Sequence, residues 1–210
     1  MRLTHFGHAC LLVQTASARL LIDPGTFSSG FEDERELTAV LITHQHADHV
    51  DTTRLAALLD ANPGVELVAD TATAEQLAGH GITARAASAG ERFDFGGTTV
   101  DTVGGKHAVI HEDIPVVPNI GYLVDDVLLH PGDSFHVPDR KVDVLALPTG
   151  APWLKASEAI DYLRAVAPRL AVPIHEAVLA RPEMMYGMFE RLGPSSSTVR
   201  VLTPGEPAEV

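Results

Sequence analysis

Three histidines and an aspartate lie within six residues of one another, in the segment His44–His49. Imidazole nitrogen and carboxylate oxygen are ligands that suit zinc, and iron and manganese are compatible with them. Residues two apart in an extended segment point to the same side, so His44 and His46 can bind one ion. Asp48 and His49 fall on the following turn and point elsewhere, which suits a second ion close to the first. The segment predicts one wall of a dinuclear metal site.

The residues on either side place this segment where a strand ends and a helix begins. Leu37–Ile42 is an apolar run typical of a buried strand, and Val50–Asp60 is predicted to be a helix. Residues 62–64 (Asn-Pro-Gly) end that helix in the expected way. Open α/β sheets bind their ligands at the carboxyl ends of strands, so the predicted site lies in a suitable place.

A dinuclear site needs more than four protein groups, and later strand ends offer them. His107 follows the predicted strand Thr98–Val103 and can complete a three-histidine set with His44 and His46. His111 lies four residues further on and is the competing choice. We favour His107 because it is nearer the end of the strand.

Two further candidates also follow predicted strands. Asp133 comes after Val127–Leu129 and a Pro-Gly turn, where a carboxylate can bridge two cations and hold them close despite their repulsion. A turn-forming role is the alternative for this aspartate. His175 ends the predicted strand Leu170–Ile174 and would supply a further ligand.

The opening strands contain two residues that can support these ligands. Asp23 ends the predicted strand Arg19–Asp23 and can accept a hydrogen bond from the second ring nitrogen of a ligand histidine. Taken alone, it would be interpreted as a turn residue. His8 lies in the first predicted strand, Leu3–Thr15, and either faces the site or is a structural histidine.

Trp153 and Lys155 lie in a loop that follows a strand of the second half of the chain. The indole could pack on a substrate there, and either Lys155 or His111 could bind an anionic substrate group. An ordinary connection with a packed tryptophan explains the same residues equally well. The chain shows no obvious long lid.

The composition of the chain is that of a globular protein, and we expect one domain over residues 1–210. A net charge of −13 repels phosphate backbones and anionic lipids, so nucleic acid is disfavoured and a small-molecule substrate is expected. The single cysteine, Cys10, fits a reducing cytosol, and no apolar run is long enough for a membrane span. We therefore expect a cytoplasmic protein. Nothing in the sequence indicates an oligomeric state.

The second half of the chain repeats features of the first. Residues 127–133, ending in Pro-Gly-Asp, mirror residues 20–25, which end in Asp-Pro-Gly, and Val142–Thr149 echoes the strand Thr38–Thr43. Helices are expected after both strands. Two such halves would pack sheet against sheet with helices outside, which predicts an α/β (α+β) fold in the form of a four-layer αββα sandwich.

These residues together resemble the metallo-β-lactamase-fold superfamily, whose signature is similar to His44-x-His46-x-Asp48-His49. Residues 7–9 and 21–24 also resemble the ascorbate-6-phosphate lactonase-like branch of that superfamily. The resemblance implies that one ion is bound by three histidines and the other by an aspartate and two histidines. In this sequence these sets are His44, His46 and His107, and Asp48, His49 and His175, with Asp133 bridging the ions and Asp23 beneath the site.

The predicted function is metal-assisted hydrolysis of a small ester, lactone, amide or phosphoester. Water bridging two divalent ions, with zinc preferred over iron or manganese, has its pKa lowered towards about 7 and supplies hydroxide at neutral pH. Asp48 would orient this nucleophile as the catalytic carboxylate. A mononuclear iron dioxygenase on the same fold and a non-catalytic metal-binding protein are the alternatives.

Overall fold

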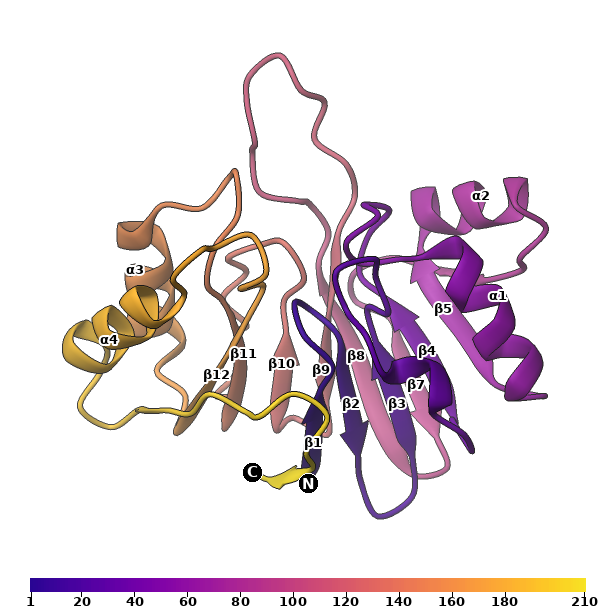
Figure 1. Cartoon of the computed structure of the whole chain (residues 1–210), viewed down its shortest axis with the longest axis horizontal. Coiled ribbons are helices and arrows are strands. Elements are labelled where there is room, and N and C mark those ends of the chain that lie inside the picture. Colours follow the sequence, from indigo (N-terminus) through magenta and orange to yellow (C-terminus); the bar gives the residue numbers. More distant parts are fainter.

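Two seven-stranded sheets lie face to face in the computed structural model, which describes all residues from Met1 to Val210 (Figure 1). The first sheet has the order β14 (Ala208–Glu209), β1 (Arg2–His5), β2 (Leu11–Gln14), β3 (Arg19–Ile22), β4 (Ala39–Ile42), β5 (Glu66–Asp70) and β6 (Arg85–Ala87). The second has the order β13 (Thr198–Val199), β12 (Leu170–Ile174), β11 (Val144–Pro148), β10 (Leu128–His130), β9 (Ile120–Val124), β8 (Thr98–Gly104) and β7 (Arg92–Phe95).

Helices cover the outer face of each sheet. Figure 1 shows α1 (Thr52–Ala61) and α2 (Thr71–Gly79) on the first sheet, and α3 (Ala156–Val166) and α4 (Glu183–Leu192) on the second. The prediction of a four-layer αββα sandwich is confirmed. None of the four helices is long and apolar enough to cross a membrane.

The two halves have the same strand pattern. An antiparallel hairpin, β2–β3 in one half and β9–β10 in the other, continues through two parallel neighbours. These neighbours are β4 and β5 in the first sheet and β11 and β12 in the second. The predicted repeat is therefore present, and the carboxyl ends of its parallel strands carry the segments that were predicted to hold metal.

Apolar side chains from both sheets fill the space between them. The central cluster joins residues such as Leu20 and Leu41 of the first sheet to Val144 and Val172 of the second, all of which are fully buried. Separate apolar clusters lie beneath α1 and α2 and beneath α3 and α4. The alternation of strand residues between an inner and an outer face produces these layers.

Aspartates fix the starts of the first two helices. Asp51 accepts hydrogen bonds from the backbone N–H groups of Thr53 and Arg54, so α1 begins two residues after the predicted start at Val50. Asp70 caps α2 in the same way. The β4–α1 connection is therefore a well-defined turn of residues 43–51.

Two sequence-based expectations need correction, and one helix was not predicted. The predicted strand Leu3–Thr15 is divided into β1 and β2, because Gly7 (φ 85°) and His8 (φ 53°) adopt left-handed backbone conformations that interrupt the ladder. Helix α4 was missed because Pro182 precedes it in place of a capping side chain and Gly187 lies within it. A long loop over residues 105–119 also projects from the body between β8 and β9, although no lid was apparent in the sequence (Figure 1).

Tyr122 joins the two sheets close to the predicted site. This fully buried residue of β9 donates its hydroxyl to the carbonyl of Ile42 in β4, at 2.8 Å. We expect Tyr122→Phe to lower the free energy of unfolding by about 1–2 kcal/mol, since it leaves a buried acceptor without this donor. Urea denaturation measures the change. Tyr186→Phe, which alters a half-buried tyrosine on α4, is the matched control and should change stability by less than about 0.5 kcal/mol. Equal effects of the two substitutions would contradict this role for Tyr122.

Candidate metal centre

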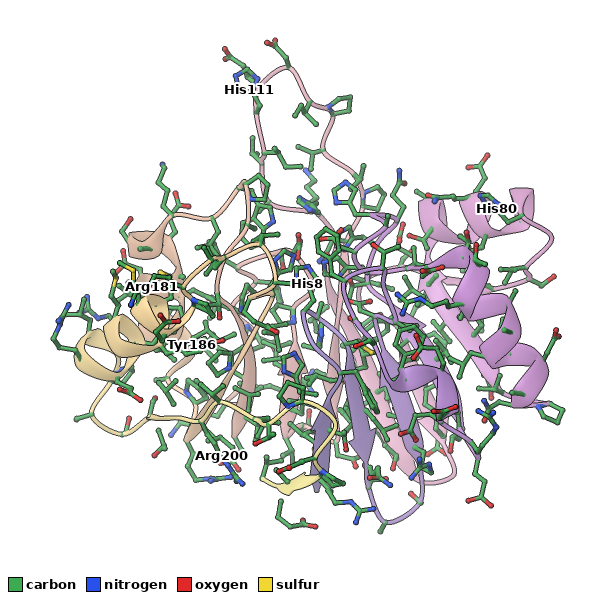
Figure 2. All side chains as sticks on the ribbon, in the orientation of Figure 1. His8, His80, His111, Arg181, Tyr186 and Arg200 are labelled. Carbon is green, nitrogen blue, oxygen red and sulfur yellow. The ribbon has the colours of Figure 1, made fainter.

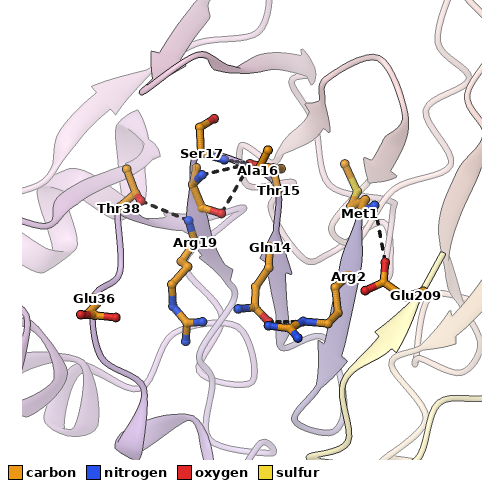
Figure 3. Close-up of a pocket in the computed structure, with 11 residues that line it drawn as sticks. Met1, Arg2, Gln14, Thr15, Ala16, Ser17, Arg19, Glu36, Thr38 and Glu209 are labelled. Atoms are coloured by element: carbon orange, nitrogen blue, oxygen red, sulfur yellow. Dashed lines mark hydrogen bonds and ion pairs between the residues drawn. The ribbon is translucent and has the colours of Figure 1, made fainter.

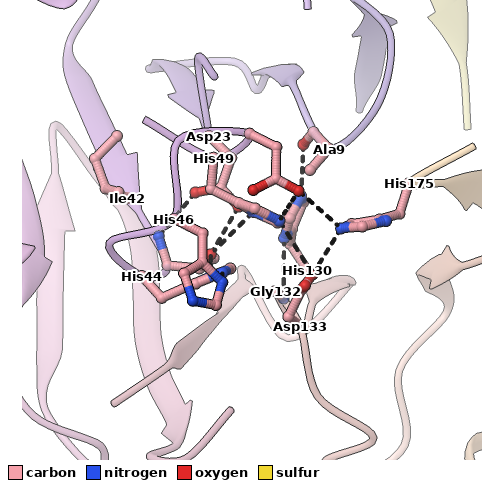
Figure 4. Close-up of polar contacts among 12 residues, drawn as sticks. Ala9, Asp23, Ile42, His44, His46, His49, His130, Gly132, Asp133 and His175 are labelled. Carbon is pink, nitrogen blue, oxygen red and sulfur yellow. Dashed lines mark hydrogen bonds and ion pairs between the residues drawn. The ribbon is translucent and has the colours of Figure 1, made fainter. Parts of the chain in front are cut away.

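Eight histidine and aspartate side chains form two adjacent groups between the halves. In each group the potential ligand atoms lie within 4.8 Å of one another. The first group is His44, His46, His107 and Asp133, and the second is His8, Asp48, His49 and His175. Figure 4 shows several of these side chains converging from opposite sides.

The ligand candidates come from the carboxyl ends of strands in both sheets. The turn after β4 carries His44, His46, Asp48 and His49, all in the first half. The second sheet supplies three more, which follow β8, β10 and β12: His107, Asp133 and His175. Neither half alone holds a complete group, so the site depends on the packing of the two sheets.

Asp133 lies between the two groups. Its Oδ1 is 3.1 Å from Nε2 of both His49 and His175, and its Oδ2 is 3.3 Å from Nε2 of His107. A carboxylate with one oxygen towards each group has the placement of a bridging ligand.

Several buried polar atoms at this site have no hydrogen-bond partner, and this tests whether the residues fit metal ions. They include Nε2 of His49, His107 and His175, and Oδ1 of Asp133. Buried polar atoms are nearly always paired, so four unpaired atoms of ligand type in one place need an explanation. Two divalent cations would satisfy them, and the imidazole and carboxylate donors suit zinc.

The other ring nitrogens identify the tautomers. Nδ1 of His175 lies 2.6 Å from the carbonyl of Gly150, and Nδ1 of His107 lies 2.5 Å from the carbonyl of Ala108. A carbonyl oxygen can only accept, so Nδ1 carries the proton and Nε2 keeps its lone pair for a cation. Such outer partners orient metal-binding histidines. His46 differs, since its Nδ1 lies 3.1 Å from Nε2 of His44.

Asp23 supports both groups from beneath. Its carboxylate, which is fully buried, accepts hydrogen bonds from the backbone N–H of Thr43 at 2.8 Å, from the Thr43 hydroxyl at 2.7 Å and from Nδ1 of His49 at 2.7 Å. The Thr43 oxygen in turn lies 3.0 Å from Nδ1 of His44. Asp23 therefore orients His49 directly and His44 through Thr43.

Close packing of two loops brings Asp23 under the metal-site turn. A Cβ atom at Gly25 would lie 1.9 Å from the carbonyl oxygen of Asp48, so only glycine fits there. The neighbouring Thr26 donates its backbone N–H to Ala47, at 2.8 Å. The sequence Asp-Pro-Gly after β3 is thus required for both its carboxylate and its missing side chain.

His8 belongs to the second group. Its Nε2 lies 3.0 Å from Oδ2 of Asp48, and its ring packs on His175 with 3.8 Å between centroids. Burial would raise the pKa of Asp48, but this hydrogen bond and the positive charge of His49 lower it to about 2. Asp48 is therefore ionised at neutral pH.

Opposed charges and burial set the protonation of the remaining groups. Burial, together with the nearby His49, holds the pKa of His44 well below its usual value, so His44 is neutral, as a histidine that binds metal has to be. Burial also lowers the pKa of His49, but Asp133 and Asp23 outweigh it and raise that pKa well above its usual value. His49 must therefore release a proton when a cation binds. Burial would raise the pKa of Asp133, and His49 is the main group that instead lowers it.

Comparison with known proteins agrees with this arrangement. The sequence matches the model of the beta-lactamase superfamily domain over residues 2–175. The chain belongs to this superfamily. It is 53% identical over 213 residues to Protein Rv0786c of Mycobacterium tuberculosis, and the aligned region covers 99% of each chain. It is 30% identical over 234 residues to a UPF0173 metal-dependent hydrolase of Opitutus terrae, and the aligned region covers 100% of each chain.

The superfamily assignment extends to the fold. The structure of Igni18, a metallo hydrolase from Ignicoccus hospitalis, matches this chain with a TM-score of 0.77 at 22% identity. The match covers 99% of this chain and 97% of that one. The metallo-β-lactamase fold that the sequence motifs implied is confirmed.

The structure separates the predicted site residues of this superfamily member into two sets. It brings together all seven predicted ligands, with Asp23 beneath them and His8 beside them; their binding of metal stays a prediction. His111 lies far from the cluster, near the tip of the projecting loop, whereas His8 lies in the interior (Figure 2). Lys155 is exposed, and its ammonium lies 3.4 Å from Glu158.

Trp153 is packed into the protein, which is one of the two alternatives that the sequence left open. Its side chain is buried, and its indole N–H donates to Oδ2 of Asp133 at 2.8 Å. The sequence placed this residue near the site but gave no information on its direction. Its ring packs edge-on against Phe135, at 5.1 Å between centroids.

Three supporting residues were missed in the sequence. Thr43 links Asp23 to His44, and its position directly before the histidine cluster was the only signal. Asn119 accepts a hydrogen bond from the backbone N–H of Asp133 at 3.0 Å. Glu176 accepts one from the backbone N–H of His8, also at 3.0 Å. The last two contacts join segments that are distant in the sequence, so no local pattern indicates them.

A separate groove of about 530 Å³ lies at the opposite ends of the strands (Figure 3). It is lined by residues such as Arg2, Gln14, Arg19 and Glu36. Its arginines have partners, since Arg2 donates to Gln14 at 2.9 Å and Arg19 pairs with Glu34. The groove contains none of the metal-ligand candidates and is unrelated to the site.

The Asp23 contacts generate a prediction. Asp23→Asn should weaken zinc binding by about 10–100-fold, because an amide cannot accept all three hydrogen bonds that orient His49 and Thr43. Asparagine tolerates the left-handed backbone at this position (φ 52°), so the fold should persist. Chelator competition measures the affinity. Asp70→Asn, a change of another buried aspartate that caps α2, is the control and should bind zinc normally. Unchanged zinc affinity in Asp23→Asn would exclude this supporting role.

Proposed function

We propose that this chain is a metal-dependent hydrolase that acts on a small molecule and uses two divalent cations, with zinc as the preferred metal. The first ion would be held by His44, His46 and His107, and the second by Asp48, His49 and His175. Asp133 would bridge the two ions. Substrates of the proposed class are esters, lactones, amides and phosphoesters.

One observation carries the proposal. Unpaired, buried Nε2 atoms of three histidines and Oδ1 of Asp133 converge from both halves of the fold. Their outer nitrogens are fixed by carbonyl and carboxylate acceptors, as is usual for metal-binding histidines. The name of the Opitutus terrae relative, a metal-dependent hydrolase, supports the same activity.

The protein groups around the ions define the chemistry. Two bound cations would lower the pKa of a coordinated water towards about 7 and would polarise the bond to be cleaved. Asp48, with a pKa of about 2, is ionised throughout the neutral range and can accept a hydrogen bond from the attacking water. A carboxylate with so low a pKa is a weak base, so Asp48 is better suited to orienting the water than to taking up its proton. His8 holds Oδ2 of Asp48 at 3.0 Å and so fixes the direction of this acceptor.

A groove beside the metal ligands supports a substrate with an apolar part. It has a volume of about 510 Å³ and is lined mainly by apolar residues, among them Val109, Ile110, Phe135 and Trp153. This volume is in the range of small-molecule sites. Trp153 contacts Asp133, so the groove adjoins the predicted bridge between the ions. The net charge of −13 disfavours a nucleic acid in this position.

The role of Asp48 has a direct test. Asp48→Asn should bind at least the first ion but lose most of its turnover, by about 100-fold or more, because the amide cannot replace the oriented anionic acceptor. The assay is hydrolysis of a panel of lactones, esters, amides and phosphodiesters by zinc-loaded protein, with metal content determined in parallel. Asp51→Asn, which alters the cap of α1 three residues away, should retain turnover. Wild-type turnover in Asp48→Asn would contradict the assignment.

Removal of metal should lower the melting temperature. An ion that binds only the folded chain stabilises it by about 2.7 kcal/mol when its free concentration is 100 times its dissociation constant. For a chain of 210 residues this corresponds to a loss of roughly 5–10 °C for each ion removed by chelation, measured by differential scanning calorimetry. A melting temperature insensitive to chelation would argue against tightly held ions.

The metal content after purification distinguishes the proposed hydrolase from its alternatives. Two zinc ions per chain and turnover on the substrate panel support the proposal. One iron per chain with oxygen uptake would indicate a dioxygenase instead. Bound metal with no turnover on any substrate of the panel would favour a non-catalytic protein.

A further inference from the structure

The single tryptophan of the chain contacts the carboxylate that lies between the two ligand groups. Trp153 is 7% exposed, and its Nε1–H donates to Oδ2 of Asp133 at 2.8 Å. Hydrogen bonds to a carboxylate are shorter and stronger than those between neutral groups. The contact is therefore strong enough to influence how Asp133 is oriented.

Trp153 differs from every other polar group near this carboxylate. The others are Nε2 atoms of His49, His107 and His175, which lie 3.1–3.3 Å from the Asp133 oxygens. A cation would engage each of these nitrogens in place of the contact with Asp133, once Nε2 of His49 has released its proton. The indole N–H can only donate and cannot bind a cation. Its hydrogen bond to Oδ2 is thus the one that persists when ions are bound.

The backbone of Asp133 is already fixed by other contacts. Its N–H donates to Asn119 at 3.0 Å, and its carbonyl accepts from the backbone N–H of Ala108 at 2.8 Å. The remaining freedom of the residue is rotation of its side chain. The indole restrains that rotation, because only one orientation keeps Oδ2 at Nε1.

The indole itself is held in place. Its ring contacts Phe135 edge-on at 5.1 Å and His107 at 6.0 Å between centroids. The loop that carries it also contains Gly150, whose carbonyl accepts a hydrogen bond from Nδ1 of His175 at 2.6 Å. One loop therefore supports a ligand candidate of each group.

We propose that Trp153 is a positioning residue that fixes the bridging carboxylate of Asp133. Its hydrogen bond occupies one lone pair of Oδ2 and leaves the other for an ion that His44, His46 and His107 would hold. Oδ1 would then be available to an ion held by His49 and His175. This inference rests on the proposed dinuclear centre.

The first test is the zinc affinity of Trp153→Phe, which keeps an aromatic ring but removes the donor. Chelator competition should give binding about 10–100-fold weaker for at least one of the two ions. Tyr162→Phe is the matched control, since it also removes one buried aromatic donor, to the carbonyl of His136 at 2.9 Å. That variant should bind both ions as the wild type does. Far-ultraviolet circular dichroism verifies that both variants are folded.

The second test uses the wild-type chain and so does not depend on the folding of a variant. Because the chain has one tryptophan, nitrogen-15 labelling gives a single indole N–H resonance. We expect this resonance to shift on addition of zinc and to reach its limit at the zinc stoichiometry of the centre. In the wild-type protein with zinc bound, its exchange with solvent should be slow, as for a hydrogen bond that persists.

The outcomes separate the inference from the function on which it rests. Absence of zinc binding by the wild type would overturn the proposed centre and the inference with it. Wild-type zinc binding together with unchanged affinity in Trp153→Phe would overturn the inference alone, as would an indole resonance that does not respond to zinc. A loss of affinity in Trp153→Phe, but not in Tyr162→Phe, supports it.

Discussion

The carboxylate of Asp23 is the interaction on which the centre depends. A buried charge is costly unless hydrogen bonds satisfy it, and Asp23 accepts from Thr43 and His49. These bonds tie the end of β3 to the turn after β4 and determine the direction of two of the ligand candidates, His44 and His49. Because Gly25 allows the two loops to touch, the sequence Asp-Pro-Gly and the histidine cluster form one structural unit.

Corresponding loops in the two halves of the fold supply different groups to the site. The turn after β4 carries four ligand candidates, and the loop at the corresponding place after β11 carries none. That second loop instead supplies the carbonyl of Gly150 to His175 and the indole of Trp153 to Asp133. Each half therefore provides both ligands and the groups that orient them, and the packing of the two sheets determines the geometry of the whole centre.

Local patterns in the sequence were sufficient for the ligand candidates because these residues follow strands that are themselves easy to recognise. His107 was preferred to His111 for its nearness to β8, and its backbone N–H indeed bonds to Val117 at the base of the projecting loop. The direction of Trp153 and the contact of Asn119 with Asp133 could not be predicted, because both depend on how distant segments meet. The division of Leu3–Thr15 into two strands was missed for a similar reason. The turn at Gly7 and His8 that divides it places His8 against Asp48, a contact between segments that are distant in the sequence.

Three residues at the candidate metal centre have strained backbone conformations, and one of them forms a backbone hydrogen bond between the two halves. His8, Asp23 and His175 all have positive φ angles, of 53°, 52° and 63°, although none is glycine. Left-handed conformations cost about 1–2 kcal/mol per residue, so the three together cost about 3–6 kcal/mol, a large part of the stability of a typical domain. Backbone hydrogen bonds offset this strain: His175 donates to the carbonyl of His8 at 2.7 Å, and Asp23 donates to that of Leu41 at 3.0 Å. The first of these bonds joins the two halves directly, so the strained residues that shape the ligand groups also connect the sheets that carry them.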